Sequence, residues 1–486
     1  MSVDGLDAET IFNTPCLGYD YEDLIALPGH ATNSIEDVDL TSFFSRNIKL
    51  RTPIVASPMD TVCEGRMATC LALLGGIGVI HCNCDADSQA AEVLSVKRYM
   101  NGFIMDPHVL SVTNTVEDVD SIRRTRDVST VMITEHGVMG SRLLGIVTAR
   151  DVDFIEDRTT TLQEVMTPKS RMVCGHEPIS LSEAQKKLQI SKKGKLPIVN
   201  DAGELVAVVS RGDVKKSRGY PHASTDPNNQ LLVAAACLPR PEEFQRVGQL
   251  VEAGADALVL DASHGDSVEQ IEFLKRVKSE FPSLEVVCGN VVTPRQAKPL
   301  LDAGADALRV GMGTSSLFSR HEACAVGRPQ ASAVYHVARY AAEQYGIPII
   351  ADGAVASSQH IAMALTLGAS SVMCGSLLAG TTESPGDAFF HDGRRLKVYR
   401  GMGLADALMQ QGGAQDKHII GAQPTAKSVR SAASCAVVDR GSAVSLIPYL
   451  MDGVKRDIRR LGVGSTWQLH DDLYNSSTRF HVRTGR

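Results

Sequence analysis

The sequence predicts an α/β fold in which eight parallel strands close into a barrel and a second module is inserted into that barrel. Short apolar runs closed by turn residues alternate with helical segments through most of the 486 residues, as in sheets whose parallel strands are buried on both faces. Between about residues 107 and 218 an internal repeat replaces this alternation. We therefore expect residues 1–106 to begin the barrel, residues 107–218 to form the inserted module, and residues 219–486 to complete the barrel with a flap and a C-terminal segment.

Two apolar runs near the N-terminus predict the first two strands. They are Pro53–Asp60 and Leu73–His81, and each is short and ends in turn residues. The segment from Gly65 to Leu74 lies between the two strands and can form a helix. The order strand, helix, strand is the βαβ unit of a parallel sheet.

The inserted segment contains two similar stretches. In each, an apolar strand is followed by a hydroxyl residue and an aspartate three positions later: Thr148 and Asp151 first, then Ser210 and Asp213, 62 residues further on. This repeat indicates two copies of one structural unit. The pair resembles a tandem cystathionine-β-synthase (CBS) domain, whose (T/S)xxD signature implies binding of an adenine or guanine nucleotide through its phosphate and ribose. The other interpretation is that Thr148 and Asp151 cap the helix after the strand.

After the insertion, a pattern recurs in which a helix ends at a glycine and a buried strand follows. Leu250–Asp261 and Leu300–Gly311 match at an offset of 50 residues, and Ala364–Gly375 is a weaker copy. Glycine is a common helix C-cap, and the apolar run after it predicts a strand. Further strands are predicted at residues 231–235, 285–288 and 348–351. The total of about eight strands favours a (β/α)8 (TIM) barrel over an open doubly wound sheet.

Polar residues follow nearly every predicted strand, and in such barrels the functional residues lie on the C-terminal face, just after the strands. The Gly/Ser-rich loop after residue 310 suits close backbone approach to an anion, because glycine tolerates positive φ. We therefore predict one site built from these segments: Ser57–Asp60, Asp261–His264, Gly289–Asn290, Gly311–Ser316, Asp352–Gly353 and Gly375–Ser376.

The composition argues against several classes of protein. With 49 basic and 56 acidic residues the formal net charge is −7, which argues against a nucleic-acid partner. No apolar run reaches the roughly 18 residues of a membrane span, and the N-terminus is unlike a signal peptide. Eleven scattered cysteines favour reduced thiols in a reducing compartment. We expect a cytoplasmic protein, because the final Thr-Gly-Arg does not match a Ser-Lys-Leu peroxisomal signal.

Nine motifs in barrel order resemble those of the IMP dehydrogenase/GMP reductase family, and together they span nearly the whole chain. They are SPMDTV from Ser57, GGIGVIH from Gly75, DASHG from Asp261, GNVVT from Gly289, GMG from Gly311, GRPQ from Gly327, ADG from Ala351, GSLLAGTTESPG from Gly375 and YRGMG from Tyr399. The resemblance also covers the position of the CBS insertion. It implies a purine-nucleotide oxidoreductase that assembles as a homo-tetramer or octamer.

The resemblance implies roles for individual residues. The 5′-phosphate of GMP or IMP would contact Ser316, Gly353, Gly375, Ser376 and Tyr399, and Ser57 and Met59 would belong to the same substrate site. Asp352 would accept hydrogen bonds from the ribose, and Met402 and Gly403 would reach the base. NADPH or NAD would lie near Asp261, Ser263, Asn290 and Arg309. A monovalent cation such as potassium would be held at Gly311, Gly313 and Phe318.

The sequence departs from the family where the nucleophile should stand. Aligned without a gap from Gly311 to Gln330, the catalytic cysteine of the family falls on Phe318, and its neighbouring threonine falls on Arg320. A phenyl ring is no nucleophile, so the cysteine adduct through which both family reactions pass cannot form there. Cys324 is six residues away, and its thiol would replace the missing one only if the loop were rebuilt.

A second departure lies in the segment Gln415–Gly421, which corresponds to a flap. IMP dehydrogenases carry there an Arg-Tyr pair that activates water, and neither residue is in place. Lys417 and His418 are either a substitute or part of a solvated loop.

Three interpretations follow. The first, which the missing flap pair favours, is a GMP reductase that converts GMP and NADPH to IMP and ammonia, impaired by Phe318. The second is an IMP dehydrogenase that converts IMP and NAD to XMP. The third is a non-catalytic, nucleotide-binding paralogue that acts as a regulatory subunit.

Overall fold

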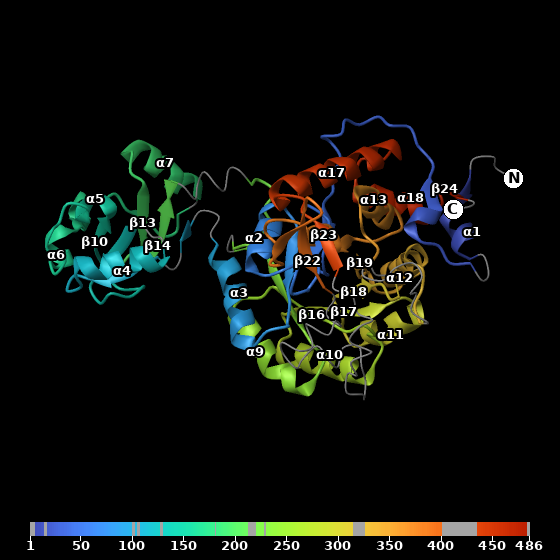
Figure 1. Ribbon diagram of the computed structural model, residues 1–486, viewed down its shortest axis with the longest axis horizontal. Coiled ribbons are helices and arrows are strands. Elements are labelled where there is room, and N and C mark those ends of the chain that lie inside the picture. The colour runs from blue at the N-terminus through green and yellow to red at the C-terminus, as the bar shows by residue number, and fades with distance from the viewer. Residues whose placement is uncertain are drawn as a thin grey trace. The chain divides into compact units, whose positions relative to one another are not determined.

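The computed structural model describes residues 5–13, 17–99, 103–104, 107–126, 130–179, 181–211, 220–227, 230–313, 326–400 and 435–483. The chain divides into two compact units (Figure 1). The first comprises residues 1–97, 222–226 and 231–486, and the second comprises residues 98–221 and 227–230. Each unit is described separately below.

The first unit contains a closed barrel of eight parallel strands, which confirms the predicted fold. In order around the barrel they are β15 (Val233–Cys237), β16 (Ala257–Leu260), β17 (Glu285–Val291), β18 (Ala307–Val310), β19 (Ile349–Asp352), β20 (Ser371–Cys374), β5 (Ile54–Ala56) and β6 (Ile77–Ile80). Helices surround these strands (Figure 1). They are α2 (Gly65–Leu73), α3 (Ala86–Arg98), α9 (Phe244–Glu252), α10 (Val268–Glu280), α11 (Pro294–Asp302), α12 (Gln330–Tyr345), α13 (Ser358–Thr366), α14 (Ser376–Ala379), α17 (Ala443–Arg460) and α18 (Thr466–Tyr474).

The repeated helix–glycine–strand pattern has the predicted geometry. After α9 and α11, Gly254 and Gly304 have φ values of 90° and 97°, a left-handed conformation that costs glycine little. The chain reverses at these glycines and enters β16 and β18. The strands β5, β6, β15, β16 and β18 consist entirely of buried residues, which explains their continuous apolar sequences.

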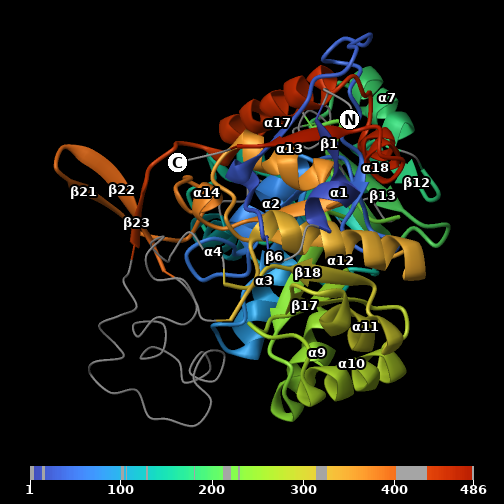
Figure 2. The same cartoon turned by 90° about the vertical axis from the view of Figure 1, so that its right-hand side faces the viewer.

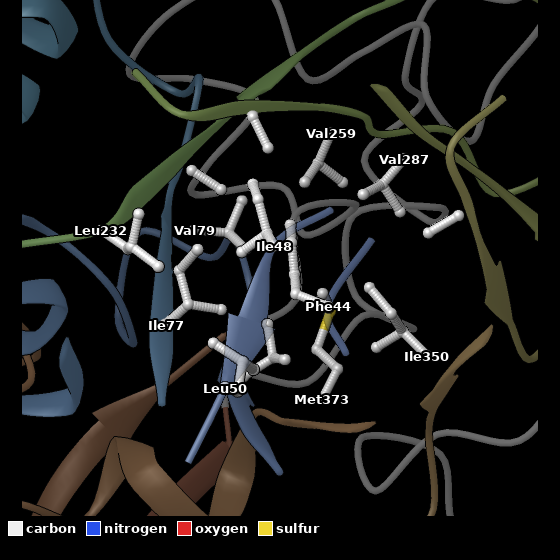
Figure 3. Packing of buried hydrophobic residues seen from close by; sticks show 14 of the residues in the cluster. Phe44, Ile48, Leu50, Ile77, Val79, Leu232, Val259, Val287, Ile350 and Met373 are labelled. Atoms are coloured by element: carbon white, nitrogen blue, oxygen red, sulfur yellow. The ribbon is translucent and has the colours of Figure 1, made fainter. Parts of the chain in front are cut away.

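The core of the barrel is filled by small and branched apolar side chains and is closed at its N-terminal end by a hairpin (Figure 3). The hairpin consists of β3 (Ser42–Phe43) and β4 (Lys49–Leu50). Phe44, Ile48 and Leu50 pack into the core cluster. The backbone N–H of Asn47 donates to Glu285 (3.1 Å), the first residue of β17, so the hairpin covers the strand starts and leaves the C-terminal face to the site.

The second unit contains two four-stranded sheets. One has the order β11 (Thr167–Pro168), β10 (Leu143–Thr148), β9 (Thr130–Thr134), β8 (Val109–Ser111), and the other β12 (Gly175–His176), β13 (Lys195–Val199), β14 (Leu205–Ser210), β7 (Phe103–Ile104). The helices are α4 (Val116–Arg126), α5 (Ala149–Val152), α6 (Leu162–Val165) and α7 (Leu181–Ser191), with the 3-10 turn η2 (Lys169–Arg171). The two repeated sequences form the equivalent strands β10 and β14, each in an antiparallel pair.

Two further sheets lie in the first unit, and the sequence patterns did not predict them. One joins β1 (Leu6–Asp7), β24 (Arg479–Val482) and β2 (Leu24–Ala26), close to α1 (Ala8–Phe12). The other joins β21 (Ala388–His391), β22 (Arg394–Tyr399) and β23 (Cys435–Val438) and projects from the barrel (Figure 2). Two 3-10 turns are η1 (Tyr21–Asp23) and η3 (Pro241–Glu243). In the part of the chain that the structure describes, no helix combines the length and apolarity needed to span a membrane.

The first prediction concerns the hairpin that closes the barrel. Phe44 is fully buried in the core cluster, so Phe44→Ala would leave a cavity and lower the free energy of unfolding by about 3–5 kcal/mol. Chemical denaturation monitored by circular dichroism measures this loss. The matched control is Phe154→Ala, because the ring of Phe154 is 93% exposed and its removal should change stability by less than about 0.5 kcal/mol. Equal effects would contradict the assignment of the hairpin to the core.

Candidate functional site

A buried arginine joins the C-terminal ends of three barrel strands. Arg309 on β18 donates from Nη1 to Oδ1 of Asp261 (2.7 Å) and from Nε to Oδ2 of Asp352 (2.7 Å). Side chains alternate between the two faces of a strand, and Ala307, Val259 and Ile350 lie in the barrel core. Arg309, Asp261 and Asp352 each follow one of these residues by two positions. The three charged groups therefore form the next layer of the interior, above the apolar core.

The two carboxylates keep Arg309 charged inside the protein. Burial alone disfavours a guanidinium, but Asp352 and Asp261 more than offset that effect, and the pKa of Arg309 is raised above its ordinary value. The side chain of Asp261 is 1% exposed, whereas that of Asp352 is 16% exposed. With two carboxylates and one guanidinium, this layer has a formal charge of −1. Removing the arginine would take the cation from two buried carboxylates.

Asn290 completes the network through its amide NH₂ group, and its amide oxygen is a further acceptor. Its Nδ2 donates to Oδ2 of Asp352 (3.0 Å) and to the carbonyl of Gly311 (2.7 Å). Its Oδ1 is buried and, among the described residues, has no hydrogen-bond partner. Because buried polar atoms are nearly always satisfied, Oδ1 indicates a donor supplied by a ligand or a water molecule.

One oxygen of Asp352 is held and the other is available. Oδ2 accepts from both Arg309 and Asn290, whereas within the described part of the chain no residue donates to Oδ1. A carboxylate fixed through one oxygen presents the other in a defined direction. This oxygen is placed to accept hydrogen bonds from a polyhydroxyl group.

The start of the Gly/Ser loop is fixed by close packing. A Cβ at Gly311 would lie 1.8 Å from the carbonyl oxygen of Asp352, so only glycine fits. The fully buried Gln330 donates from Nε2 to the carbonyls of Val310 (2.9 Å) and Asp352 (3.0 Å). Gln330 thus holds the ends of β18 and β19 together beneath the loop.

A second group of residues lies where β5 and β20 end. The N–H of Ser57 donates to the carbonyl of Cys374 (3.1 Å), and the hydroxyl of Tyr399 lies 3.8 Å from the sulfur of Met59. A Cβ at Gly375 would lie 2.8 Å from the Tyr399 hydroxyl. Met59, Gly375 and Tyr399 therefore meet at one place, and Ser376 follows as the first residue of α14.

Comparison with known proteins identifies the family. The sequence model of the IMP dehydrogenase/GMP reductase domain matches residues 18–485. This chain belongs to the IMP dehydrogenase/GMP reductase family. Members of this family are oxidoreductases that use a nicotinamide nucleotide, NAD(P), as cofactor.

Proteins named inosine-5′-monophosphate dehydrogenase are similar over almost the full length. The chain is 48% identical to that of Toxoplasma gondii, with 99% of this chain and 96% of the relative covered. It is 43% identical to that of Trypanosoma brucei brucei (99% and 93% covered) and 45% identical to that of Schizosaccharomyces pombe (96% and 90% covered).

Solved structures of a GMP reductase share the fold. A cysteine-to-alanine variant of GMP reductase from Trypanosoma brucei in complex with guanosine 5′-monophosphate has a TM-score of 0.86 and 33% identity, with 98% of this chain and 97% of that chain covered. The enzyme in complex with guanosine 5′-triphosphate has a TM-score of 0.79 and 31% identity (98% and 100% covered).

The structure brings some of the predicted residues of this IMP dehydrogenase/GMP reductase family member together. Asp261, Asn290, Arg309, Gly311 and Asp352 form one network. Ser263 lies two residues beyond Asp261, and Gly313 and Gly353 lie in the loops of the same face, with φ values of 84° and 113°. Ser57, Met59, Gly375, Ser376 and Tyr399 form the second group. The following residues lie outside the described part of the chain: Asp213, Ser316, Phe318, Arg320, Cys324, Met402, Gly403 and Gln415–Gly421.

Sequence reasoning missed two residues that the structure places in the site, Gln330 of the GRPQ motif and Arg400 of the YRGMG motif. Asp60 lies in the predicted segment Ser57–Asp60 but was given no role of its own. Arg400 pairs with Asp60 through Nε at 3.1 and 3.3 Å. A polar residue inside a motif is the signal that could have identified them, although the sequence does not show their partners.

In the inserted unit, Thr148 and Asp151 bond to one another. The backbone N–H and the hydroxyl of Thr148 both donate to Oδ2 of Asp151, each at 2.7 Å, at the start of α5. This is the helix cap that the sequence offered as one interpretation. Ser210 is buried at the end of β14. Nucleotide binding by this module stays a prediction.

Burial raises the thiol pKa of seven of the described cysteines. Burial raises the pKa of Cys374, beside Gly375, to about 12 and that of Cys84 to about 11. Burial likewise raises the pKa of Cys63, Cys70, Cys174, Cys237 and Cys288. A thiol with a raised pKa is a poor nucleophile at neutral pH, so none of these seven thiols is suited to replace the missing cysteine.

The second prediction concerns the buried arginine. Arg309→Met should lower the free energy of unfolding by about 3–5 kcal/mol, because it removes the cation that neutralises the buried carboxylates of Asp261 and Asp352. Denaturant unfolding measures the change. The control is Arg46→Met, which removes a half-exposed partner 3.5 Å from Asp306 and should cost less than about 1 kcal/mol. A loss of under 1 kcal/mol at Arg309 would mean that the network is not a buried ion pair.

Proposed function

We propose that this chain binds a purine nucleoside 5′-monophosphate, with IMP preferred, at the C-terminal face of its barrel beside a nicotinamide cofactor, and that covalent turnover is impaired. The observation that carries this proposal is the fixed carboxylate of Asp352. Arg309 and Asn290 hold its Oδ2, which leaves Oδ1 to accept from the 2′- and 3′-hydroxyls of a ribose. The second group of residues, at Met59, Gly375 and Tyr399, would receive the 5′-phosphate.

The residues present fit a nicotinamide nucleotide. The buried Oδ1 of Asn290 needs a donor, and the carboxamide of a nicotinamide has an NH₂ group that can supply it. Asp261, Ser263, Asn290 and Arg309 would hold this cofactor, whose chemistry when bound is the transfer of a hydride. The apolar core beneath Arg309 excludes water from below the site, which strengthens the electrostatic interactions within it.

The relatives favour IMP over GMP as the substrate of the enzyme from which this chain descends. Four proteins named inosine-5′-monophosphate dehydrogenase are 42–48% identical to this chain, whereas the structures of GMP reductase are 31–33% identical. The GMP reductase interpretation stays a prediction that one observation favours, namely the absence of an Arg-Tyr pair in Gln415–Gly421. A reductase has no need to activate water.

Turnover is expected to be slow in either direction. The family reactions pass through a cysteine adduct, and Phe318 stands at that position in the alignment. Loss of a covalent nucleophile typically lowers kcat by several orders of magnitude while binding persists. On this proposal the protein is either an impaired oxidoreductase that forms a homo-tetramer or octamer, or a nucleotide-binding paralogue that acts as a regulatory subunit.

The inserted unit would add a site for a third ligand, a nucleotide, and a cation would be the fourth. An adenine or guanine nucleotide would bind at Thr148, Asp151 and Ser210 only if the hydrogen bonds between Thr148 and Asp151 were exchanged for ligand contacts. Potassium at Gly311 would share its carbonyl with Asn290, which already donates to it.

The third prediction tests substrate binding. IMP or GMP at a hundredfold excess over its Kd should stabilise the folded protein by about 2.7 kcal/mol, measured as a rise in the melting temperature. Asp352→Asn should weaken this response, because an amide at that position places an N–H donor where an acceptor is needed. The control is Asp302→Asn, at a half-exposed side chain on α11. If neither nucleotide changes the melting temperature, the proposed site fails.

The fourth prediction tests the chemistry. Phe318→Cys should raise the rate of NAD reduction with IMP, or of NADPH oxidation with GMP, by about a hundredfold or more, followed by absorbance of the reduced nicotinamide. Cys324→Ala should leave the slow rate of the natural protein unchanged. Fast turnover by the natural protein that Cys324→Ala abolishes would instead make Cys324 the nucleophile.

A further inference from the structure

Three consecutive residues after β5 contact the end of β22. Met59 meets the Tyr399 hydroxyl, Asp60 pairs with the guanidinium of Arg400, and the N–H of Arg400 donates to the Thr61 hydroxyl (3.3 Å). These contacts join segments about 340 residues apart in sequence. They link the projecting sheet of β21, β22 and β23 to the C-terminal face of the barrel (Figure 2).

Asp60 is the charged centre of this contact. Its side chain is 7% exposed and that of Arg400 is 22% exposed, so water weakens the pair far less than a surface salt bridge. Oδ2 of Asp60 also accepts from Nδ2 of Asn83 (3.0 Å). The backbone N–H of Asn83 in turn donates to Nδ1 of His81 (3.0 Å), at the end of β6. Asp60 therefore ties together the ends of β5, β6 and β22.

The position of the Tyr399 hydroxyl depends on where β22 ends. This hydroxyl lies so close to Gly375 that a Cβ there would be 2.8 Å from it. Two residues earlier, Lys397 donates to the carbonyls of Thr381 (2.6 Å) and Ser384 (2.7 Å), which fixes β22 against the segment that follows α14. Asp60 fixes the C-terminal end of β22 through Arg400, the residue after Tyr399.

We propose that Asp60 is a positioning residue that, through Arg400, holds the Tyr399 hydroxyl at Gly375 and so sets the affinity of the site for the 5′-phosphate. The inference rests on the proposed function, which puts the phosphate there. Asp60 itself does not contact the nucleotide in this scheme. A carboxylate in the same place would repel phosphate unless it were paired, and Arg400 neutralises it.

The test compares a nucleotide with its nucleoside. IMP and inosine differ only by the 5′-phosphate. The Kd of inosine divided by the Kd of IMP, both measured by isothermal titration calorimetry on the full chain, therefore isolates the phosphate contribution. Asp60→Asn should lower this ratio by about tenfold, mainly by weakening IMP, within the range of coupling energies for residues in one network. Arg400→Met should do the same. The double variant should lose no more than either single variant, because both break one contact.

Two further variants keep the inference falsifiable. Arg400→Lys retains a cation and should restore part of the ratio even if the uncharged variants fold poorly. Asp306→Asn is the matched control, because it breaks a comparably buried pair with Lys278 (2.8 Å) at the N-terminal end of the barrel. This control should lower stability and leave the ratio unchanged.

Each outcome has a distinct meaning. Asp60 is structural only, and the inference is overturned, if the folded Asp60→Asn variant keeps the Kd ratio of the natural protein. The same holds if Asp60→Asn lowers stability and the Kd ratio no more than Asp306→Asn does. If the natural protein binds IMP no better than inosine, or binds neither, the proposed phosphate site is wrong and the proposed function fails with it.

Discussion

The site depends on the burial of one guanidinium inside a barrel. Arginine is the only residue type that can donate to two carboxylates from separate N–H groups of fixed geometry and keep its charge at any physiological pH. Arg309 supplies this group. Its partner Asp352 ends the neighbouring strand β19, and its partner Asp261 follows β16, the second strand on the other side. The three side chains therefore fix the relative positions of β16, β18 and β19 at the C-terminal face. Exchanging Arg309 for an apolar residue would take the cation from both carboxylates, whereas exchanging one aspartate would leave the arginine paired with the other.

The interior of the barrel changes from apolar to polar along its axis. Its N-terminal end is closed by Phe44, Ile48 and Leu50, which are apolar and interchangeable in principle with side chains of similar volume. One layer above, three strands place the charged side chains of Arg309, Asp261 and Asp352 inward, and each has a specific partner. The change occurs within a single strand: in β18, Ala307 belongs to the core and Arg309 to the site. The period of two residues that predicts a strand thus also assigns its residues to one end or the other.

The sequence predicted what is encoded locally. Apolar runs, glycine C-caps at Gly254 and Gly304, and the 50-residue repeat are short-range signals, and they were enough for the barrel. Pairings between distant segments leave no such signal. The sheet of β1, β24 and β2 joins the two ends of the chain, and the Asp60–Arg400 pair joins residues 340 positions apart. Thr148 and Asp151 show a different limit, because a helix cap and a phosphate site use the same two side chains. The structure shows the cap, and nucleotide binding stays a prediction.

The network around Asp352 and the position that aligns with the family's catalytic cysteine belong to different parts of the chain. Asp352 is oriented by Arg309 and Asn290, Gly311 is held against β19, and Gln330 on α12 supports both. Each of these interactions is made between residues outside 314–325, the segment that contains Phe318. The network is therefore complete without a side chain from that segment, so the proposed contact between Asp352 and a ribose does not depend on which residue stands at position 318.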